Sequence, residues 1–337
     1  MVVDKSHTTN HEPKQDLYDE HIIKPYGHRD YLFFYKHVAW IIQDFIKNRP
    51  IGTKILIPNG PQLIKRASKL GPIYCKDIIE NVDVNYLKLR SNMHLKDVQH
   101  MLSEKQKLIW KYFLPRKSIE FFYSTNGEVF GGKSALKEEP MIDRIFLDID
   151  RKDISFYEVT KIMIRLVQIF EEDNIRRFVS EHISDYKTFV MYTGNSWHIY
   201  LLLNHKVKEN LYFRFIQHKN SELVPSLATR IVNLLKQEFP NVSIGHEKKQ
   251  HSVIIDPSQT PFGKLARAPY SLHLKQAYDI DGIAVPIPLY LFKKMVDHNI
   301  PSEQLIDEII NYLNKFDLSY IIQNRDELRT ELKRVMK

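Results

Sequence analysis

Cysteine is almost absent from this sequence: its 337 residues include a single one, Cys75. One cysteine cannot form an internal disulfide, and it cannot build a cysteine-based zinc or iron–sulfur site. We therefore expect no zinc within this chain. A reducing compartment fits this composition, so we expect a cytoplasmic, intracellular protein that is not secreted.

Long apolar runs are also lacking. The first residues, MVVDKSHTTNHEPKQD, do not contain the apolar core of a signal peptide. The most apolar segment, residues 31–47, is interrupted by charged and polar residues from Lys36 to Asp44. It predicts a buried amphipathic helix and gives no reason to expect a membrane partner. Internal repeats and low-complexity tracts are absent as well.

The sequence is rich in apolar residues and has a net positive charge. Its hydrophobic content of 43% and aromatic content of 12% indicate a packed globular protein of one large or two ordinary domains. The net charge of +8 and the pI near 9.2 suit a polyanionic partner such as nucleic acid or nucleotides.

The pattern of elements divides the chain into four parts. We expect a flexible tail at 1–16, a mainly helical region at 17–113, a core of strands, hairpins and helices at 114–290, and helices at 291–337. Strands that alternate with helices, together with hairpins, predict a mixed α+β fold. Within the second part, HLKDVQHMLSEKQKLIWKYFL, residues 94–114, has the pattern of one amphipathic helix that Pro115 ends.

The segment RIFLDID, residues 144–150, combines a core-like strand with two carboxylates. Alternation along a strand puts Ile145, Leu147 and Ile149 on one face, and Asp148 and Asp150 on the other. Two like charges on one face repel each other unless a cation lies between them, and a metal ion commonly does so. Taken alone, this pattern also fits the solvated face of an edge strand.

Other predicted strands repeat this division into two faces. In SWHIYLLL, Ser196 and His198 lie opposite the aliphatic face, and SVIID ends in Asp256 just before a proline. In SLHLK the polar face holds Ser271, His273 and Lys275. Each motif alone has an ordinary structural explanation: a core histidine, a turn serine, an edge strand or a strand-to-loop exit. In one sheet, however, they would place three carboxylates beside hydrogen-bond donors, as a site for divalent metal and triphosphate requires.

Four motifs in order, FLDID, TGNSWHIYLL, VIID and RAPYSLHLK…IAVPI, resemble the catalytic core of archaeo-eukaryotic primases, and most closely the small catalytic subunit. That family has a hydrophobic-Asp-hydrophobic-Asp motif, a Ser-x-His motif on a hairpin and a third aspartate after an apolar strand. A Pro-aromatic-Ser-hydrophobic-His-x-Lys segment follows, and then a short strand ending in Val-Pro. The resemblance covers about residues 115–290, so the part at 114–290 is the expected primase-polymerase catalytic core.

The resemblance implies a central sheet that carries the acidic site, with helices at its flanks. It implies a template-dependent nucleotidyltransferase, a DNA primase or primase-polymerase, which makes or extends RNA or DNA primers in DNA replication. Its expected partners are a single-stranded DNA template and NTPs or dNTPs. A large primase subunit or other replication proteins are further candidates, and in a prokaryote the protein would be associated with the nucleoid.

The resemblance also assigns roles to individual residues. Asp148, Asp150 and Asp256 would be catalytic and would hold two Mg²⁺ or Mn²⁺ ions. The residues that it implies for nucleotide binding are Ser196, His198, Arg267, Ser271, His273 and Lys275.

The sequence departs from the family pattern in two respects. The glycine-rich approach to the histidine is reduced to Gly194, so the hairpin tip is expected to differ. The cysteine-bearing zinc module of many small subunits is absent, which puts unaided primer initiation in doubt.

Three other functions remain open. Nucleotide-sugar glycosyltransferases also use Asp-x-Asp after an apolar strand to hold a metal–diphosphate, but they require neither Asp256 nor the Ser-x-His hairpin. The others are a metal-dependent nuclease and a non-catalytic nucleic-acid-binding subunit on a primase-like scaffold. A non-catalytic relic would be expected to lose its acids first, and all three are present here.

Overall fold

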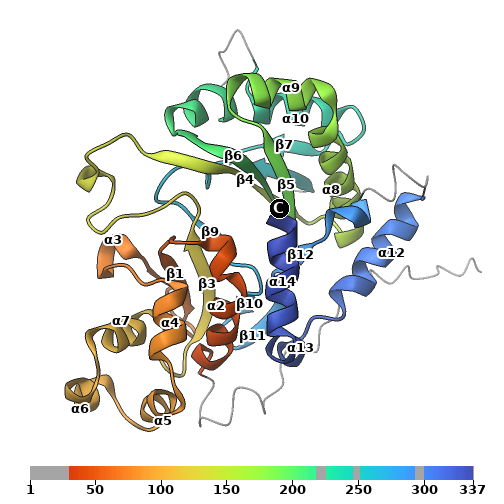
Figure 1. Cartoon of the computed structure of the whole chain (residues 1–337). Helices are drawn as coiled ribbons and strands as arrows, with labels where there is room; N and C mark the ends of the chain where they lie inside the picture. Colours follow the sequence, from red (N-terminus) through yellow and green to blue (C-terminus); the bar gives the residue numbers. More distant parts are fainter. Residues whose placement is uncertain (1–29, 218–224, 246–250, 293–299, 337) are drawn as a thin grey trace, which may run out of the picture.

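The computed structural model describes residues 30–217, 225–245, 251–292 and 300–336, and the expected tail at 1–16 lies outside these ranges. The described chain forms three β-sheets with helices packed around them. This architecture, visible in Figure 1, confirms the mixed α+β class predicted from the sequence.

The largest sheet has six strands in the order β12-β5-β6-β4-β8-β7. Neighbouring strands are antiparallel except for the parallel pair β7 and β8. The central strand β4 pairs with β6 on one side and with β8 on the other. The strands are β4 (Met141–Lys152), β5 (Tyr186–Tyr192), β6 (Trp197–Lys208), β7 (Val242–Ile244), β8 (Ser252–Asp256) and β12 (Val285–Ile287).

A second sheet has four strands in the order β2-β1-β3-β9. Strands β1 and β2 fall within the region at 17–113, which the sequence pattern predicted to be mainly helical, and β3 and β9 fall within 114–290. The sheet therefore crosses the boundary drawn at residue 113, and the division into domains stays a prediction. The strands are β1 (Ile51–Leu56), β2 (Leu63–Lys65), β3 (Ser118–Ser124) and β9 (Leu265–Arg267).

The third sheet is the hairpin of β10 (Leu272–Gln276) and β11 (Asp279–Ile283). Its register shifts next to Leu274, on both sides of that residue. Such irregularities interrupt the simple alternation of faces along a strand.

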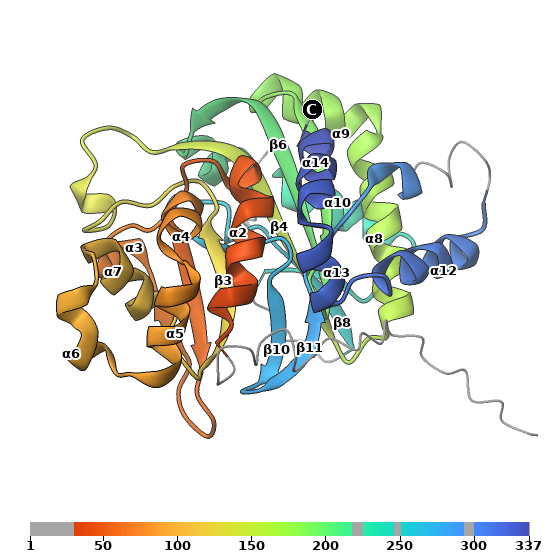
Figure 2. The same ribbon diagram turned by 60° about the horizontal axis from the view of Figure 1, so that its bottom comes forward.

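The helices gather at two sides of the molecule, as Figures 1 and 2 show. None of the described helices has the length and apolarity needed to cross a membrane. Those on the side of the four-stranded sheet are α2 (Leu32–Ile46), α3 (Ala67–Leu70), α4 (Cys75–Asn81), α5 (Val84–Asn92), α6 (Leu95–Val98) and α7 (Glu104–Tyr112). Those on the side of the six-stranded sheet are α8 (Phe156–Glu171), α9 (Asp173–His182), α10 (Leu227–Lys236) and α12 (Ser302–Leu313). The chain ends in α13 (Leu318–Gln323) and α14 (Arg325–Met336), which pack against α2.

Helix α2 joins the two large sheets. The ring of Phe45 lies 5.8 Å from that of Tyr123 on β3 and 4.9 Å from that of Phe189 on β5. Because it packs on both sheets and under α14, α2 is buried on most of its surface. This explains why most of its residues are apolar.

The two faces of β6 have different neighbours. Trp197 stacks on Phe156 of α8 with 6.1 Å between ring centroids, so this face is covered by helices. His198 points to the opposite face, where it lines a cavity. The division of faces predicted for this strand is therefore confirmed.

The single helix predicted over 94–114 is wrong. Helix α6 and a 3₁₀ turn at Gln99–Met101 precede a break, after which α7 begins. Ser103 Oγ accepts a hydrogen bond from the amide of Gln106 at 3.2 Å, and the Gln106 side chain accepts one from the amide of Ser103 at 3.1 Å. This capping box begins a new helix, and its Ser-x-x-Gln signature is present in the sequence.

Candidate active site

The acidic motif of β4 lies at the centre of the six-stranded sheet. Asp148 pairs directly with Asp256 on β8 and with His198 on β6. Directly opposed residues in antiparallel strands share a face, and so do residues two apart in one strand. The three aspartates and His198 therefore lie on one face, although their motifs are up to 108 residues apart.

The negative charge of this face is incompletely balanced. Desolvation by the surrounding protein raises the pKa of Asp150 to about 6, and the charge of Asp148 adds to the rise. Lys152 and His198 oppose it, while Asp256 adds a smaller increase. A carboxyl group whose pKa is raised by neighbouring carboxylates is stabilised in its charged form by an added cation.

Two of the three carboxylates have protein partners. Asp148 Oδ1 lies 3.2 Å from His198 Nε2, and the imidazole packs edge-on against Phe146 at 4.7 Å. Asp256 accepts hydrogen bonds from the amide and the hydroxyl of Ser258, each at 2.8 Å. This is the local turn that an aspartate favours at the end of a strand.

Whether the acidic face suits a metal ion depends on the atoms that it offers as ligands. Among the described residues, no group of three or more His, Cys, Asp or Glu side chains is arranged to hold one. The donors are nevertheless carboxylate oxygens, which Mg²⁺ and Mn²⁺ prefer, and they lie on one sheet face with excess negative charge. By the chemistry of their donors and by their shared face, the three carboxylates therefore fit a divalent ion.

The tip of the β5–β6 hairpin is fixed by close packing. Gly194 has φ +95°, and a Cβ added there would lie 2.6 Å from Cβ of His273 and 3.0 Å from the backbone of Gly282. Glycine is thus required both for its conformation and for the approach of the β10–β11 hairpin. Ser196 is buried, and its hydroxyl donates to the carbonyl of Ile149, between the two aspartates of β4.

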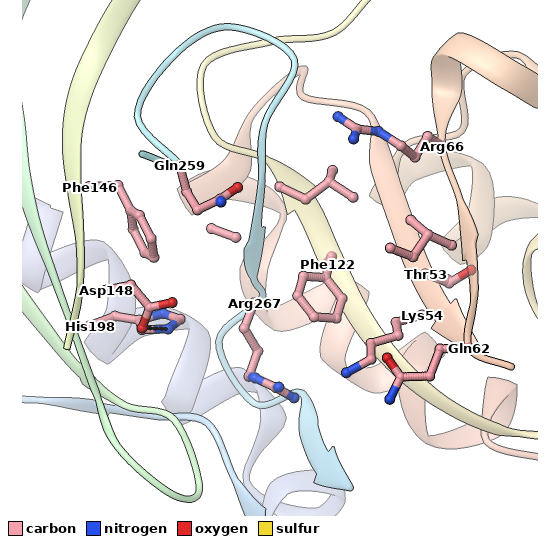
Figure 3. A pocket seen from close by; sticks show the side chains of 13 residues that line it. Thr53, Lys54, Gln62, Arg66, Phe122, Phe146, Asp148, His198, Gln259 and Arg267 are labelled. Carbon is pink, nitrogen blue, oxygen red and sulfur yellow. Dashed lines mark ion pairs between the residues drawn. The ribbon is translucent and has the colours of Figure 1, made fainter. Parts of the chain in front are cut away.

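A cavity of about 400 Å³ separates the acidic face from the four-stranded sheet. Figure 3 shows Asp148 and His198 on one side, Thr53, Lys54, Gln62 and Arg66 on the other, and Arg267 between them. The side opposite Asp148 thus carries Lys54 of β1 and Arg66 just after β2, and Arg267 of β9 adds a third cation between the two sides. The volume is that of a small-molecule site.

Glu120, buried on β3, holds two of these cations. Its Oε1 lies 3.0 Å from Arg267 Nη1 and accepts a hydrogen bond from the amide of Leu274 at 2.9 Å, and its Oε2 lies 3.4 Å from Lys54 Nζ. Burial alone would raise the pKa of Glu120, but Arg267 and Lys54 outweigh it and hold the pKa below its ordinary value. The charged carboxylate therefore keeps both cations in place along the cavity.

The three residues predicted from SLHLK do not line this cavity. Ser271 is fully buried: its hydroxyl accepts from the amide of Phe121 at 2.8 Å and donates to the carbonyl of Leu272 at 3.2 Å. His273 Nδ1 lies 3.2 Å from Asp281 Oδ2, and its proximity lowers the pKa of Asp281. Lys275 is exposed on β10. His273 adjoins the β5–β6 hairpin through Gly194, so His273 flanks the site.

The structure thus brings Asp148, His198 and Arg267 to one cavity, with Asp150 and Asp256 beside Asp148. Sequence reasoning missed Lys54, Arg66 and Glu120. The run IGTKIL, between Pro50 and Pro58 and with β-branched Ile51 and Ile55, carried the signal for a strand at Lys54. The sequence contains no comparable signal for the role of Arg66 or Glu120.

Among known proteins, the matches to this chain are solved structures. No protein-family model and no curated protein matches the sequence. Among the solved structures that match is the polymerase domain from Mycobacterium tuberculosis ligase D in complex with DNA. The two chains are 16% identical with a TM-score of 0.45, and the match covers 89% of this chain and 96% of that one.

Proposed function

We propose that this chain is a template-dependent nucleotidyltransferase, a DNA primase or primase-polymerase that makes or extends primers on single-stranded DNA. One observation carries the proposal: Asp148, Asp150 and Asp256 share a sheet face that looks across a nucleotide-sized cavity at Lys54, Arg66 and Arg267. An acidic wall suits divalent ions, and the cationic wall opposite suits the phosphates that such ions bind.

In this proposal Asp148, Asp150 and Asp256 hold two Mg²⁺ or Mn²⁺ ions. When bound, the ions would acidify the attacking hydroxyl and neutralise charge on the leaving phosphates. His198 and Arg267 line the cavity and are the phosphate contacts that the geometry favours most. Ser196, Ser271, His273 and Lys275 stay proposals that rest on the motif resemblance.

The chain's own part is positioning and charge complementation. A 3′-hydroxyl attacks the α-phosphate in line, and pyrophosphate leaves towards the cations. Glu120 keeps Arg267 and Lys54 in fixed positions, so little reorganisation is needed as charge develops on the phosphates.

The direct test is nucleotide incorporation on a primed single-stranded DNA template. NTPs and dNTPs are supplied separately, with Mg²⁺ or Mn²⁺, and the length of the labelled primer is measured. We expect extension that chelation of the divalent ion abolishes. If folded protein extends the primer with neither nucleotide class and neither ion, the proposal is wrong.

His198→Ala is expected to weaken nucleotide binding by about tenfold while leaving DNA affinity nearly unchanged, because one hydrogen bond to a charged phosphate is lost. Labelled nucleotide and labelled oligonucleotide are titrated separately. Lys275→Ala should act in the same direction with a smaller effect, since an exposed lysine is a flexible point charge. Unchanged nucleotide affinity in His198→Ala would leave this histidine a structural role beside Asp148 and Phe146.

Primer initiation is expected to be weaker than extension. Starting a primer requires two nucleotides held by protein contacts alone, whereas extension gains binding energy from the phosphates of a duplex. With one cysteine this chain cannot build the zinc module that the resemblance associates with initiation. Dinucleotide formation on unprimed template is compared with extension of an annealed primer at equal enzyme and nucleotide. Comparable rates would show that initiation needs no partner subunit.

A further inference from the structure

Two further cavities adjoin at the far end of the six-stranded sheet. Their volumes are about 380 and 360 Å³, and they share Lys47, Asp143 and Lys206 in their walls. The two adjoining cavities are here called the basic groove. None of its lining residues lines the cavity beside Asp148, so the groove is a separate feature.

Strand register places the basic groove relative to the acidic row. Arg144 pairs with Leu202, and Leu202 pairs with Lys187, which forms a row across β4, β6 and β5. The row through Asp148 and His198 lies four residues further along β4, or about 13 Å at the rise of a strand. Phe45 of α2 contacts Tyr200 and Phe189, which lie between the two rows.

The basic groove carries strong positive charge. Its walls contain five cationic side chains (Lys47, Arg49, Arg144, Lys187 and Lys206) and one carboxylate, Asp143. Arg49 and Arg144 both bind that carboxylate, so it is already compensated. The three lysines are exposed, and no ion pair involves any of them among the described residues. Uncompensated lysines on the rim of a groove attract a polyanion.

The lining also indicates how a ligand would be held. Of the two rings in the walls, Phe45 is fully buried and cannot stack on a base, and the other is the exposed imidazole of His205. Exposed lysines contact phosphates without reading sequence. Two adjoining cavities that share Lys47 and Lys206 in their walls can hold successive phosphates of one chain, whereas a compact anion would occupy only one of them.

We propose that the basic groove binds the sugar–phosphate backbone of single-stranded nucleic acid, independently of sequence. The choice of a single-stranded nucleic acid rests on the proposed function, because the proposed template is single-stranded. The binding itself does not depend on catalysis.

The test is salt-dependent binding of a labelled single-stranded oligonucleotide without nucleotide or divalent ion. The variant Lys47→Gln/Lys187→Gln/Lys206→Gln is compared with Lys88→Gln/Lys96→Gln/Lys111→Gln. The control removes the same charge from three exposed lysines on α5, α6 and α7. All six positions are exposed, so both proteins are expected to fold, which circular dichroism checks.

For the groove variant we expect the slope of log affinity against log salt to fall in magnitude by about 2, since each lost phosphate contact removes about 0.7. Affinity near 0.1 M salt should drop by about tenfold or more. The control should keep the slope of the unmodified chain. Equal slopes in the two variants would overturn the proposal, whatever the outcome of primer extension. A lower slope in a protein that extends no primer would support the groove and reject only the catalytic proposal.

Discussion

The Asp148→Asn variant is expected to fold and to incorporate nucleotides at least about a thousandfold more slowly than the unmodified chain. Asn keeps the shape of the side chain and removes its charge, so the strand pairing with β6 and β8 is retained. A lost metal ligand removes several kcal/mol of transition-state stabilisation. Asp150→Asn should behave similarly, because its carboxylate lies on the same face.

Asp153→Asn is the matched control for this prediction. Asp153 follows β4 in the next turn, is exposed, and has φ +55°, a conformation that asparagine tolerates. Its substitution removes one negative charge from the same segment and should leave extension nearly unchanged. Primer extension and a thermal melt are measured for all three variants. Substantial extension by folded Asp148→Asn or Asp150→Asn would reject their assignment as metal ligands.

Asp143→Asn is expected to lower the free energy of unfolding by about 3–5 kcal/mol at pH 7. Both oxygens of Asp143 accept from Arg49, and Arg144 Nε donates to it at 3.0 Å. The two guanidinium groups are nearly buried, with side chains 9% and 5% exposed. Without the carboxylate they would face each other as uncompensated charges.

Asp143 should also make the free energy of unfolding depend on pH in the acid range. Burial would raise the pKa of Asp143, but Arg144 and Arg49 outweigh it and lower the pKa to about 2, from an ordinary value of 3.8. A carboxyl group with a depressed folded pKa stabilises the fold above its ordinary pKa, and this contribution is lost as the pH falls through its folded pKa. The difference between the two proteins should therefore shrink by about 2 kcal/mol between pH 5 and pH 2.

Urea unfolding at pH 7, 5 and 2 measures this effect. Asp97→Asn serves as the control, because Asp97 is exposed on α6 with no ion pair among the described residues, and it should change stability by less than about 0.5 kcal/mol. If Asp143→Asn loses as little unfolding free energy at pH 7 as the control does, the prediction is wrong. The two guanidinium groups would then have moved out into solvent.

The acidic face could be predicted from the sequence because it depends on local alternation. Asp148 and His198 each sit opposite an aliphatic face in their own strands, and the pairing of β4 with β6 brings them together. The alternation of faces does not predict the position of Ser271. This residue precedes β10, and the residue before it, Tyr270, has φ +62°. The chain turns there, so the Ser271 side chain enters the interior towards β3.

Alternation along single strands does not predict the cationic wall, of which the motif resemblance named Arg267 but not Lys54 or Arg66. Arg267 reaches Glu120 because β9 pairs with β3, with Phe122 opposite Arg267. That pairing joins segments more than a hundred residues apart, and no local pattern in either strand specifies it. Lys54 was missed for a different reason: the short strand β1 lies among helices, where the surrounding helical periodicity dominated the interpretation.

The pairing of β3 with β9 also determines the order in which the chain can fold as it leaves the ribosome. Strands β1, β2 and β3 can associate early, but the free edge of β3 stays unpaired until residue 267 has emerged. Helix α2 is covered later still, because α14, which packs on it, ends at residue 336. An unpaired strand edge is a template for association with other chains. The nascent protein therefore carries an aggregation-prone edge from the synthesis of β3 to the synthesis of β9.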